Sequence, residues 1–501
     1  MSLPLYKAFG VDTNAGVVHQ DEDFMTLINR MERPEKIDFE LPEDLTATLR
    51  PYQETGYKWL KGLDHYGFGG ILADDMGLGK TLQVISFIAG SLGKGDTKPY
   101  LVICPSSVLY NWQKEFQQFA PDIKTRLITG MKSERRDTIA TAIAENIPVW
   151  ITSYPLLQRD EDLYEGLAFR TVILDEAQSV KNATAKTTKA ASALNANNKI
   201  ALSGTPVENA LSELYTIFSI AQPGLFGTKK DFKQMDPAQI AKKVKPFILR
   251  RLKADVLKDL PPKIESISYI EMTEKQKTVY LSQLQLMRQE TKEMLDADTL
   301  NENRIKILAG LTRLRQICCD PALVMADYTG GSGKLDRLME YLAEAKENGR
   351  RVVLFSQFTQ MLAIIREKLD ETSEAYFYLD GQTPNQDRLA LTTRFNEGEK
   401  DLFLISLKAG GTGLNLTGGD TVILYDSWWN PAVESQATDR VHRFGQKKVV
   451  QVVRLIATGT IEERINELQA KKREMIDSVI QAGGQSVTSL SKEELMQLLE
   501  I

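Results

Sequence analysis

The sequence contains few cysteines, few histidines and no long apolar run. Its 501 residues include only three cysteines, Cys104, Cys318 and Cys319, which are too few for a disulfide framework and lack the paired spacing of a zinc site. Three histidines argue against an imidazole-rich metal centre. No apolar segment reaches the roughly 18 residues that cross a bilayer, and Asp21, Glu22 and Asp23 stand where a secretory segment would be apolar. We therefore expect a cytosolic protein without a membrane partner.

The chain also lacks the net positive charge that is typical of nucleic-acid-binding proteins. Its 62 Lys and Arg residues face 67 Asp and Glu residues, which gives a formal net charge of −5. Residues 229–263 are an exception, because they hold eleven Lys or Arg against four Asp, a local balance of +7 beside −12 for the remainder. Such a run is either a solvated helix face or a local basic contact surface. The composition thus excludes a protein coated in positive charge, but not one that binds an anion locally.

Hydrophobic residues at 42% and charged residues at 26% are ordinary for a folded globular protein, and the length allows about three domains. Short β-branched runs alternate with helical stretches in two sets. Such near-continuous apolar strands predict α/β domains with parallel sheets covered by helices on both faces. The predicted strands are 71–73, 101–104, 149–152, 172–174 and 199–202 in the first set, and 352–355, 377–379, 402–405, 422–425 and 449–456 in the second.

Between the two sets the strand pattern is lost, and residues 226–330 read as a helical, basic insertion and linker with periodic stretches at 275–295 and 304–318. A capping box at Ser491 and Glu494 predicts a short helix near the end of the chain. The expected domains are an N-terminal segment at 1–44 that resembles the end of a preceding domain, a first α/β domain at 45–225, the insertion at 226–330, a second α/β domain at 331–470 and a helical tail at 471–501.

Residues 74–81 read DDMGLGKT between a predicted strand and a predicted helix, which is the context of a phosphate-binding loop. Its glycines let backbone amides approach phosphate oxygens, Lys80 can neutralise the β and γ phosphates, and the Thr81 hydroxyl can hold magnesium. Asp74 stands where the generic pattern has its first glycine, and the alternative is a glycine-rich turn with an incidental lysine. A second sequence, GGSGK at 330–334, lacks the preceding strand and is interpreted as a flexible entry to the second domain.

Two further groups of charged residues complete a candidate hydrolytic site. Asp175 and Glu176 follow a predicted strand, so that one acid can bind magnesium while the other orients and deprotonates the attacking water. Arg440 and Arg443 are spaced i, i+3, which places them on one face of a helix and makes them candidates for stabilising transition-state charge. The alternatives are exposed acids that arise by chance and surface arginines in ion pairs. We interpret His442 as a structural or lobe-contact residue rather than a metal ligand.

These motifs and their order resemble the Swi/Snf-like family of helicase superfamily two, whose members are double-stranded DNA translocases. The match runs from about residue 49 to 465. It includes LRPYQETGYKWL, DDMGLGKT, LVICPSSVLYNW, ITSYP, DEAQ, ALSGTPVEN, FILRRLKADVLKDLPPK, SGKL, VVLFSQF, YLDGQT, ISLKAGGTGLNLTGGDTVILYDSWWNP and QATDRVHRFGQ. The stretches around Arg250 and Trp428 are the most specific, because generic helicases lack them. Asp75 and Gln178 depart from the Glu and His that are more usual.

The resemblance implies two RecA-like lobes with family-specific helical insertions, and ATP with Mg²⁺ as cofactors. It implies that Gln53 contacts adenine, that Thr81 and Asp175 bind magnesium, and that Ser203, Gly204 and Thr205 couple the nucleotide to the second lobe. The implied catalytic residues are Lys80, Asp175, Glu176, Arg440 and Arg443, and the implied nucleotide-binding residues are Gln53, Asp75, Met76, Gly77, Leu78, Gly79, Lys80, Thr81, Gly411 and Gly413.

The resemblance also implies contacts to DNA through small polar groups, which suit phosphate contacts that position a duplex without reading its bases. The implied contact residues are Ser106, Ser107, Asn111, Ser153, Tyr154, Ser356, Gln357, Phe358, Lys408, Ala409 and Gly410. Trp428 and Trp429 are interpreted as packing residues rather than as base-stacking ones.

We therefore expect a monomeric DNA-dependent ATPase that moves along double-stranded DNA and displaces or remodels DNA-bound proteins. The alternatives are a strand-separating DNA or RNA helicase and, from another class, a nucleotide-binding scaffold without turnover. A nuclease is not indicated, since no second acidic cluster suits paired metals. The compact second lobe is typical of bacterial or archaeal members, and the chain reads as the motor part of a longer protein. Its expected location is the nucleoid of a prokaryote or the nucleus of a eukaryote.

Overall fold

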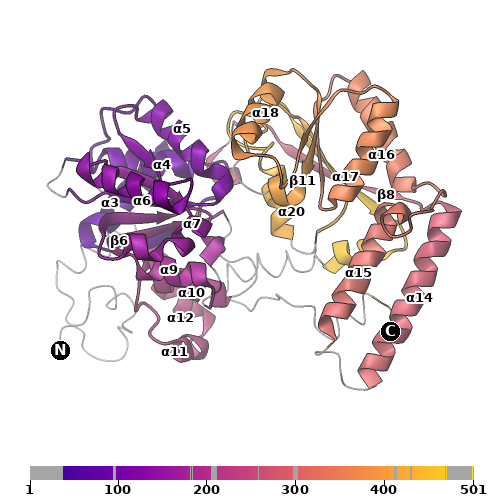
Figure 1. Ribbon diagram of the computed structural model, residues 1–501, viewed down its shortest axis with the longest axis horizontal. Coiled ribbons are helices and arrows are strands. Elements are labelled where there is room, and N and C mark those ends of the chain that lie inside the picture. The colour runs from indigo at the N-terminus through magenta and orange to yellow at the C-terminus, as the bar shows by residue number, and fades with distance from the viewer. Residues whose placement is uncertain are drawn as a thin grey trace. The chain divides into compact units, whose positions relative to one another are not determined.

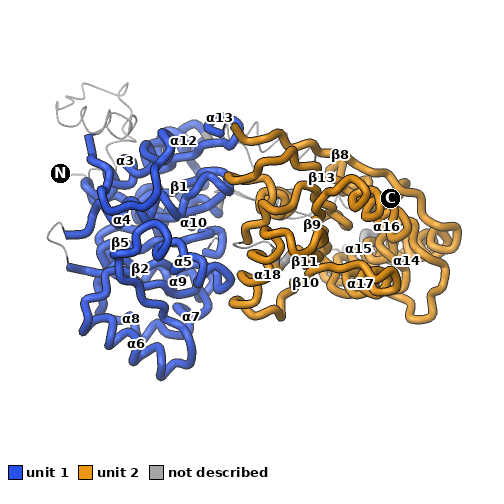
Figure 2. The backbone as a smooth tube through the Cα atoms, turned by 90° about the horizontal axis from the view of Figure 1, so that it is seen from above, with its two compact units in different colours: residues 1–258, 476–486 blue, residues 259–475, 487–501 orange. Residues whose placement is uncertain are grey.

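The structure, a computed structural model, describes residues 38–93, 97–180, 182, 184–204, 211–257, 259–296, 303–410, 414–428, 431–468, 470 and 499. The chain divides into two compact units, residues 1–258 with 476–486 and residues 259–475 with 487–501 (Figure 2). Each unit contains one parallel sheet with helices packed on it. The prediction of two α/β domains with parallel sheets is therefore confirmed.

Unit 1 is built on a seven-stranded parallel sheet in the order β3-β4-β2-β5-β6-β1-β7. Its central strands are buried on both faces, as the continuous apolar runs predicted. All five strands expected in this part of the chain are present. The strands are β1 (Gly70–Leu72), β2 (Tyr100–Cys104), β3 (Thr125–Leu127), β4 (Val149–Ser153), β5 (Ala168–Leu174), β6 (Asn195–Leu202) and β7 (Ile248–Leu249).

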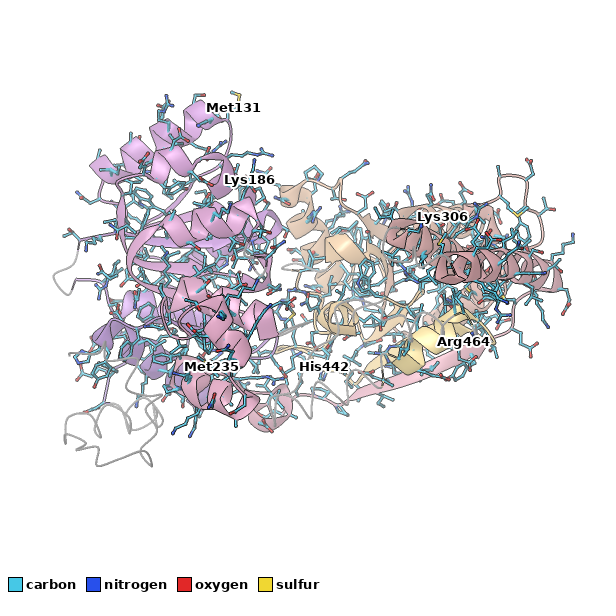
Figure 3. The ribbon with its side chains drawn as sticks, turned by 90° about the horizontal axis from the view of Figure 1, so that it is seen from below. Met131, Lys186, Met235, Lys306, His442 and Arg464 are labelled. Atoms are coloured by element: carbon cyan, nitrogen blue, oxygen red, sulfur yellow. The ribbon has the colours of Figure 1, made fainter. Side chains whose placement is uncertain are left out.

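Helices α3, α4 and α5 lie on one face of this sheet, and α7, α9 and α10 lie on the other (Figure 1). Met235 marks the end of α11, which begins the basic segment, and Met131 projects from the start of α6 (Figure 3). The helices are α3 (Pro51–Tyr66), α4 (Lys80–Ala89), α5 (Leu109–Phe119), α6 (Lys132–Ala144), α7 (Tyr154–Arg159), α8 (Glu161–Tyr164), α9 (Lys186–Ala193), α10 (Leu211–Ala221), α11 (Lys229–Gln234), α12 (Pro237–Val244) and α13 (Lys253–Val256), with 3-10 turns η2 (Ser106–Val108), η3 (Ala177–Val180) and η4 (Lys245–Phe247).

Unit 2 has a six-stranded parallel sheet in the order β10-β11-β9-β12-β13-β8. The five strands predicted in the second set are again present. The strands are β8 (Lys263–Ile270), β9 (Val352–Ser356), β10 (Tyr376–Leu379), β11 (Leu402–Ser406), β12 (Thr421–Leu424) and β13 (Val450–Ala457).

Two apolar clusters cover the two faces of this sheet, one with α16 and α17 and the other with α18 and α20. A third cluster lies between α14 and α15 and includes the buried Leu499 near the end of the chain. The capping box at Ser491 and Glu494 lies outside the described residues. The helices are α14 (Glu274–Asp296), α15 (Arg304–Cys319), α16 (Gly333–Glu347), α17 (Thr359–Glu371), α18 (Asn385–Glu397), α19 (Leu407–Gly410) and α20 (Pro431–Thr438), with the 3-10 turn η5 (Pro321–Leu323).

The predicted helical segment 226–330 is not helical throughout. It contains β7, which pairs with β1 in unit 1, and β8, which pairs with β13 in unit 2, so the two units divide inside it. β8 is an edge strand whose Ile264 and Tyr269 are more than half exposed, so its sequence lacks the continuous apolar run of a buried strand. The prediction was therefore wrong at β7 and β8, and it also missed the short edge strand β3. In the part of the chain that is described, no helix combines the length and the apolar character that crossing a bilayer requires.

Candidate active site

The loop between β1 and α4 forms the candidate phosphate site. Gly77 and Gly79 have φ angles of 84° and 73°, in the left-handed region that side chains rarely adopt. A Cβ atom at Gly79 would also lie 2.6 Å from Nε2 of Gln53. The glycines are therefore required by the turn, which leads directly into the N-terminus of α4 at Gly79. Such a helix N-terminus is a ready anion-binding site.

Lys80, the first residue of α4, lies over this loop. Its Nζ donates to the carbonyl oxygen of Asp74 at 2.6 Å. Burial lowers the pKa of Lys80, while the carboxylates of Glu176, Asp74 and Asp175 oppose that shift. The structure thus places the predicted loop lysine close enough to the predicted acidic pair for their charges to interact.

Asp175 follows β5 and is held by two aromatic side chains. Nε1 of Trp112 donates to its Oδ2 at 2.8 Å, and the Tyr154 hydroxyl donates to its carbonyl oxygen at 2.7 Å. Burial and the neighbouring Glu176 raise the pKa of Asp175 to about 7. A bound cation would reverse this effect, because its charge favours the carboxylate form. Trp112 was not among the predicted site residues, although it is the last residue of the LVICPSSVLYNW motif.

The Glu176 carboxylate has a different hydrogen-bond partner from that of Asp175. Its φ angle is 49°, and its amide donates to Oδ1 of Asp175 at 3.0 Å. Nε2 of Gln178 donates to Oε2 of Glu176 at 2.7 Å, and the Ser203 hydroxyl donates to Oε1 of Gln178 at 3.2 Å. Gln178, the departure from the usual histidine, therefore still orients the carboxylate and connects it to the end of β6.

Gln53 on α3 contacts the phosphate loop. Its Nε2 donates to the carbonyl oxygen of Leu78 at 3.2 Å, and its Oε1 accepts from the amide of Arg50 at 3.0 Å. Gly204 lies beside the same loop, because a Cβ atom there would come within 2.7 Å of Met76. Contact of Gln53 with adenine and coupling through Ser203 and Gly204 stay predictions, and Thr205 lies outside the described residues.

The sequence did not predict the partner of Asp74. This carboxylate is fully buried and accepts from Nε of Arg251 at 2.8 Å, with a second contact from the same guanidinium. Arg251 belongs to the family-specific stretch after β7. The signals in the sequence were that stretch and the acid at a position where the generic phosphate loop has glycine, but neither indicated that the two residues pair.

The DNA-contact residues predicted in unit 1 divide into two groups. Ser106 and Ser107 lie on η2, where Ser106 is exposed, and Asn111 donates to Oε1 of Glu115 at 2.7 Å one turn along α5. Ser153 and Tyr154 are 1% and 4% exposed, and the Tyr154 hydroxyl contacts Asp175. The side chains of this second group face the interior near the acidic pair, so their prediction as DNA contacts has no support in their placement.

The DNA-contact loop predicted in unit 2 follows β9. The hydroxyl of Ser356 donates to the buried carboxylate of Asp426, which also accepts from the amide of Gln357 at 3.2 Å. The amide of Phe358 donates to the Ser356 hydroxyl at 3.2 Å. Asp426, which the sequence analysis missed, therefore fixes the backbone of this loop from the end of β12. Ala409 is buried in α19, and the side chain of Lys408 is not among those described.

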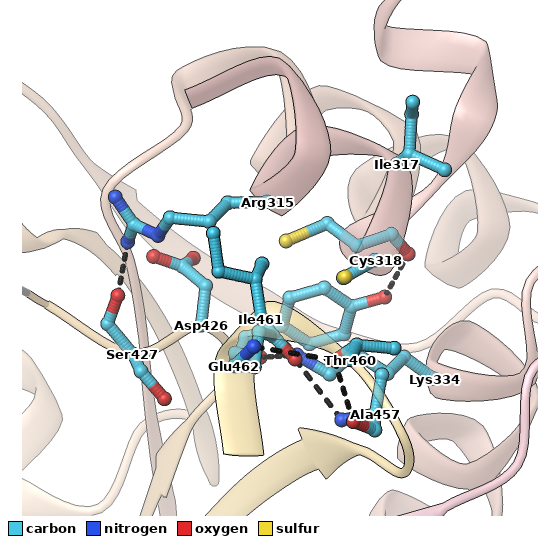
Figure 4. Close-up of polar contacts among 12 residues, drawn as sticks. Arg315, Ile317, Cys318, Lys334, Asp426, Ser427, Ala457, Thr460, Ile461 and Glu462 are labelled. Carbon is cyan, nitrogen blue, oxygen red and sulfur yellow. Dashed lines mark hydrogen bonds and ion pairs between the residues drawn. The ribbon is translucent and has the colours of Figure 1, made fainter. Parts of the chain in front are cut away.

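Two buried basic side chains, one on α15 and one on α16, donate hydrogen bonds to the backbone of the segment after β12 (Figure 4). The Arg315 guanidinium donates to the carbonyl oxygen of Ser427 and lies 5.7 Å from the ring centre of Phe358. Nζ of Lys334 donates to the carbonyl oxygen of Tyr425 at 2.8 Å and lies 2.7 Å from a carboxylate oxygen of Glu462. The GGSGK sequence is thus the capped start of α16, and its interpretation as a flexible entry was wrong.

We expect Lys334→Met to lower the free energy of unfolding by about 3–5 kcal/mol, because Glu462 would keep a buried charge without its partner. Both side chains are at most 1% exposed. The exposed pair of Lys346 and Glu374 provides the control, since Lys346→Met should cost about 1 kcal/mol or less. Urea denaturation measures both. Equal losses in the two variants would contradict the structural role of Lys334.

Arg440 and Arg443 are not on one helix face. Helix α20 ends at Thr438, and the arginines lie in the turns that follow. The amides of Arg440 and Val441 bond three residues back, and the carbonyl oxygen of Arg440 accepts from the amide of Leu416, so these residues form turns rather than a continuation of α20. The prediction of a shared helix face was wrong, whereas their catalytic role stays a prediction.

Other predicted residues of unit 2 have mixed outcomes. Nε2 of His442 lies 2.8 Å from the carbonyl oxygen of Pro261, in agreement with a structural role. Trp428 packs on the cluster that covers one face of the sheet, as predicted. Gly411, Gly413 and Trp429 lie outside the described residues.

Family models match both parts of the chain. The SNF2-related domain matches residues 52–323, more than half of the sequence, and the helicase conserved C-terminal domain matches residues 333–445. The chain belongs to the SNF2 family. The resemblance noted from the motifs is confirmed, and the two SNF2 and helicase domains indicate an ATP hydrolase.

Several relatives of this SNF2 chain are similar over most of its length. A putative ATP-dependent helicase/translocase, YwqA, of Bacillus subtilis is 37% identical over 98% of this chain and 55% of the relative. A SWI/SNF-related regulator of chromatin of Mus musculus is 37% identical over 90% of this chain and 45% of the relative. The chain spans about half the length of the curated relatives it matches. The solved SWI2/SNF2 ATPase core of Sulfolobus solfataricus in complex with dsDNA is 35% identical over 93% of this chain and 100% of that chain, with a TM-score of 0.45.

Proposed function

We propose that this chain is a DNA-dependent ATPase that couples ATP hydrolysis to movement along double-stranded DNA and thereby displaces or remodels DNA-bound proteins. The observation that carries the proposal is the grouping, within unit 1, of the glycine loop, Lys80 and the acidic pair at the ends of β1 and β5. Membership of the SNF2 family supports the same chemistry.

In this proposal the loop amides and Lys80 bind the β and γ phosphates, and Glu176 holds and deprotonates the attacking water. The Thr81 hydroxyl and Asp175 would hold Mg²⁺, which supplies positive charge to the phosphate oxygens when bound. Asp175 fits this role, because its raised pKa reflects burial beside another acid, and Mg²⁺ needs only one or two carboxylates besides phosphate and water. Arg440 and Arg443 would add positive charge from the second lobe.

The proposed track is the phosphate backbone of a duplex. Ser106, Ser107 and Asn111 in unit 1 carry hydroxyl and amide donors in the segment after β2. Gln357 in unit 2 carries a side-chain amide after β9, in a loop whose Ser356 hydroxyl and backbone amides are already bonded within the protein. Such donors position a duplex without reading its sequence. We propose double-stranded DNA and a DNA-bound protein as partners, a monomer as the working state, and the nucleoid or nucleus as the location.

We expect duplex DNA to stimulate ATP turnover several-fold more than single-stranded DNA or RNA. Steady-state turnover titrated with each nucleic acid at two salt concentrations measures this. If at least two phosphates are contacted, the duplex concentration for half-maximal stimulation should rise roughly tenfold between about 50 and about 200 mM salt. The proposal would be contradicted if none of the three nucleic acids changed the rate of ATP turnover.

Strand-displacement assays, read together with ATP turnover, distinguish the alternatives. A translocase on duplex DNA should displace a triplex-forming third strand without separating the two strands below it. Separation of the duplex strands would instead assign a strand-separating helicase. Nucleotide binding without turnover, with or without nucleic acid, would assign a scaffold.

A further inference from the structure

The segment that follows β7 runs alongside the phosphate loop. The pairing of β1 with β7 continues past both strands. The amide of Ala73 donates to the carbonyl oxygen of Leu249 at 2.7 Å, and the amide of Asp75 donates to the carbonyl oxygen of Arg251 at 3.0 Å. The amide of Lys253 then donates to Oδ2 of Asp75 at 2.9 Å. Residues 248–253 are therefore a side wall of the loop rather than part of a separate basic insertion.

The Arg251 guanidinium is the centre of this wall. It makes two contacts to the buried carboxylate of Asp74, donates to Oε1 of Gln83 on α4 at 2.7 Å, and also donates to the carbonyl oxygen of Tyr52 on α3. It lies 5.4 Å from the ring centre of Tyr52. A planar guanidinium can make this two-point contact with a carboxylate, whereas a lysine ammonium cannot.

The neighbours of Arg251 also hold the far end of the loop. The carbonyl oxygen of Leu78 accepts from the Tyr52 hydroxyl at 3.2 Å, from Nε2 of Gln53 at 3.2 Å and from Nε2 of Gln83 at 3.4 Å. Nε2 of Gln83 lies in addition 3.2 Å from Asp74. One network therefore fixes the loop at Asp74, where it begins, and at Leu78, two residues before Lys80.

Gly56 shows how closely this network is packed. A Cβ atom there would lie 1.8 Å from Oε1 of Gln83 and 2.9 Å from Nη2 of Arg251. Helix α3 can thus approach the guanidinium only because this position lacks a side chain.

We propose that Arg251 is a positioning residue of the ATP site, which holds the loop 74–79 in its phosphate-binding conformation through Asp74 and ties that loop to the chain that leaves unit 1 at residue 258. An unpaired buried carboxylate at the start of the loop would be costly, so the loop would shift to reach water if the guanidinium were removed. The inference rests on the proposed role of this loop in binding ATP.

Arg251→Lys, Arg251→Gln and Asp74→Asn test the proposal in the full chain. Arg251→Gln should raise the KM for ATP about tenfold or more, with a smaller change in kcat, because the loop binds phosphate before the chemical step. Arg251→Lys should give a smaller increase, since it keeps the charge and loses the two-point contact. The double variant Arg251→Gln/Asp74→Asn should be no worse than Arg251→Gln alone, because both changes break one interaction.

The buried pair of Arg135 and Asp160 in the same unit is a matched control. It has the same two-point geometry, with Nε to Oδ2 at 2.5 Å and Nη2 to Oδ1 at 2.6 Å, but it lies between α6 and the residue that ends α7. Arg135→Gln should lower the Tm and leave the KM unchanged. The exposed Arg250→Gln controls for the loss of one positive charge beside Arg251.

The proposal would be overturned if Arg251→Gln had a lowered Tm but a KM for ATP within twofold of wild type. Arg251 and Asp74 would then be a structural ion pair without a role in ATP binding. If Arg251→Gln does not fold, Arg251→Lys and Asp74→Asn decide by the same measurement. Lys80→Ala separates this failure from failure of the proposed function. If Lys80→Ala keeps ATP turnover, the loop is not the ATP site and the proposed function fails. If Lys80→Ala loses turnover while the Arg251 variants keep a normal KM for ATP, only the inference about Arg251 fails.

Discussion

Glu176→Gln is expected to reduce ATP turnover by about 10²–10⁴-fold while ATP still binds. The amide has nearly the shape of the carboxylate but cannot accept a proton from the attacking water. Gln178 donates to the Glu176 carboxylate and is itself held by Ser203 at the end of β6, so the glutamine side chain should keep the same position. Steady-state turnover and binding of a fluorescent ATP analogue measure the two effects separately.

The exposed Glu161→Gln is the control for this replacement, because it removes the same charge from α8 on the surface of unit 1. It should leave both measurements unchanged. Equal turnover in Glu176→Gln and wild type would remove Glu176 from the chemistry. Loss of ATP binding in Glu176→Gln would instead indicate that its charge shapes the site rather than activates water.

The strands could be predicted from the sequence because both sheets are parallel and buried on both faces. Such strands are continuous apolar runs, as in β2 and β9, and each is followed by the polar residues of a loop. The edge strands β3 and β8 break this rule, whereas the edge strand β10 keeps enough apolar residues to be predicted. β8 pairs on one side only and keeps Ile264 and Tyr269 exposed, so its sequence resembles that of a polar linker.

The candidate site could be predicted only where its chemistry is local in the chain. The glycine loop and the acidic pair are contiguous motifs, and the structure brings them together. Asp74 and Arg251 are 177 residues apart, and only the pairing of β7 with β1 places them side by side. Arg440 and Arg443 show the opposite error, since their spacing suits a helix and also suits the turns that the structure contains.

Lys80→Ala is expected to lower ATP turnover by at least about 10²-fold and, unlike Glu176→Gln, to weaken ATP binding as well. The carboxylates of Glu176, Asp74, Asp175 and Asp75 all act on the Lys80 ammonium, so the alanine variant would present phosphate with uncompensated negative charge. Lys80→Arg should rescue little, because a broad guanidinium does not replace a compact ammonium at a carbonyl 2.6 Å away. The exposed Lys124→Ala is the control for loss of charge. Wild-type ATP turnover in Lys80→Ala would show that this loop is not the ATP site. Intact ATP binding with lost turnover would show that Lys80 acts only in the chemical step.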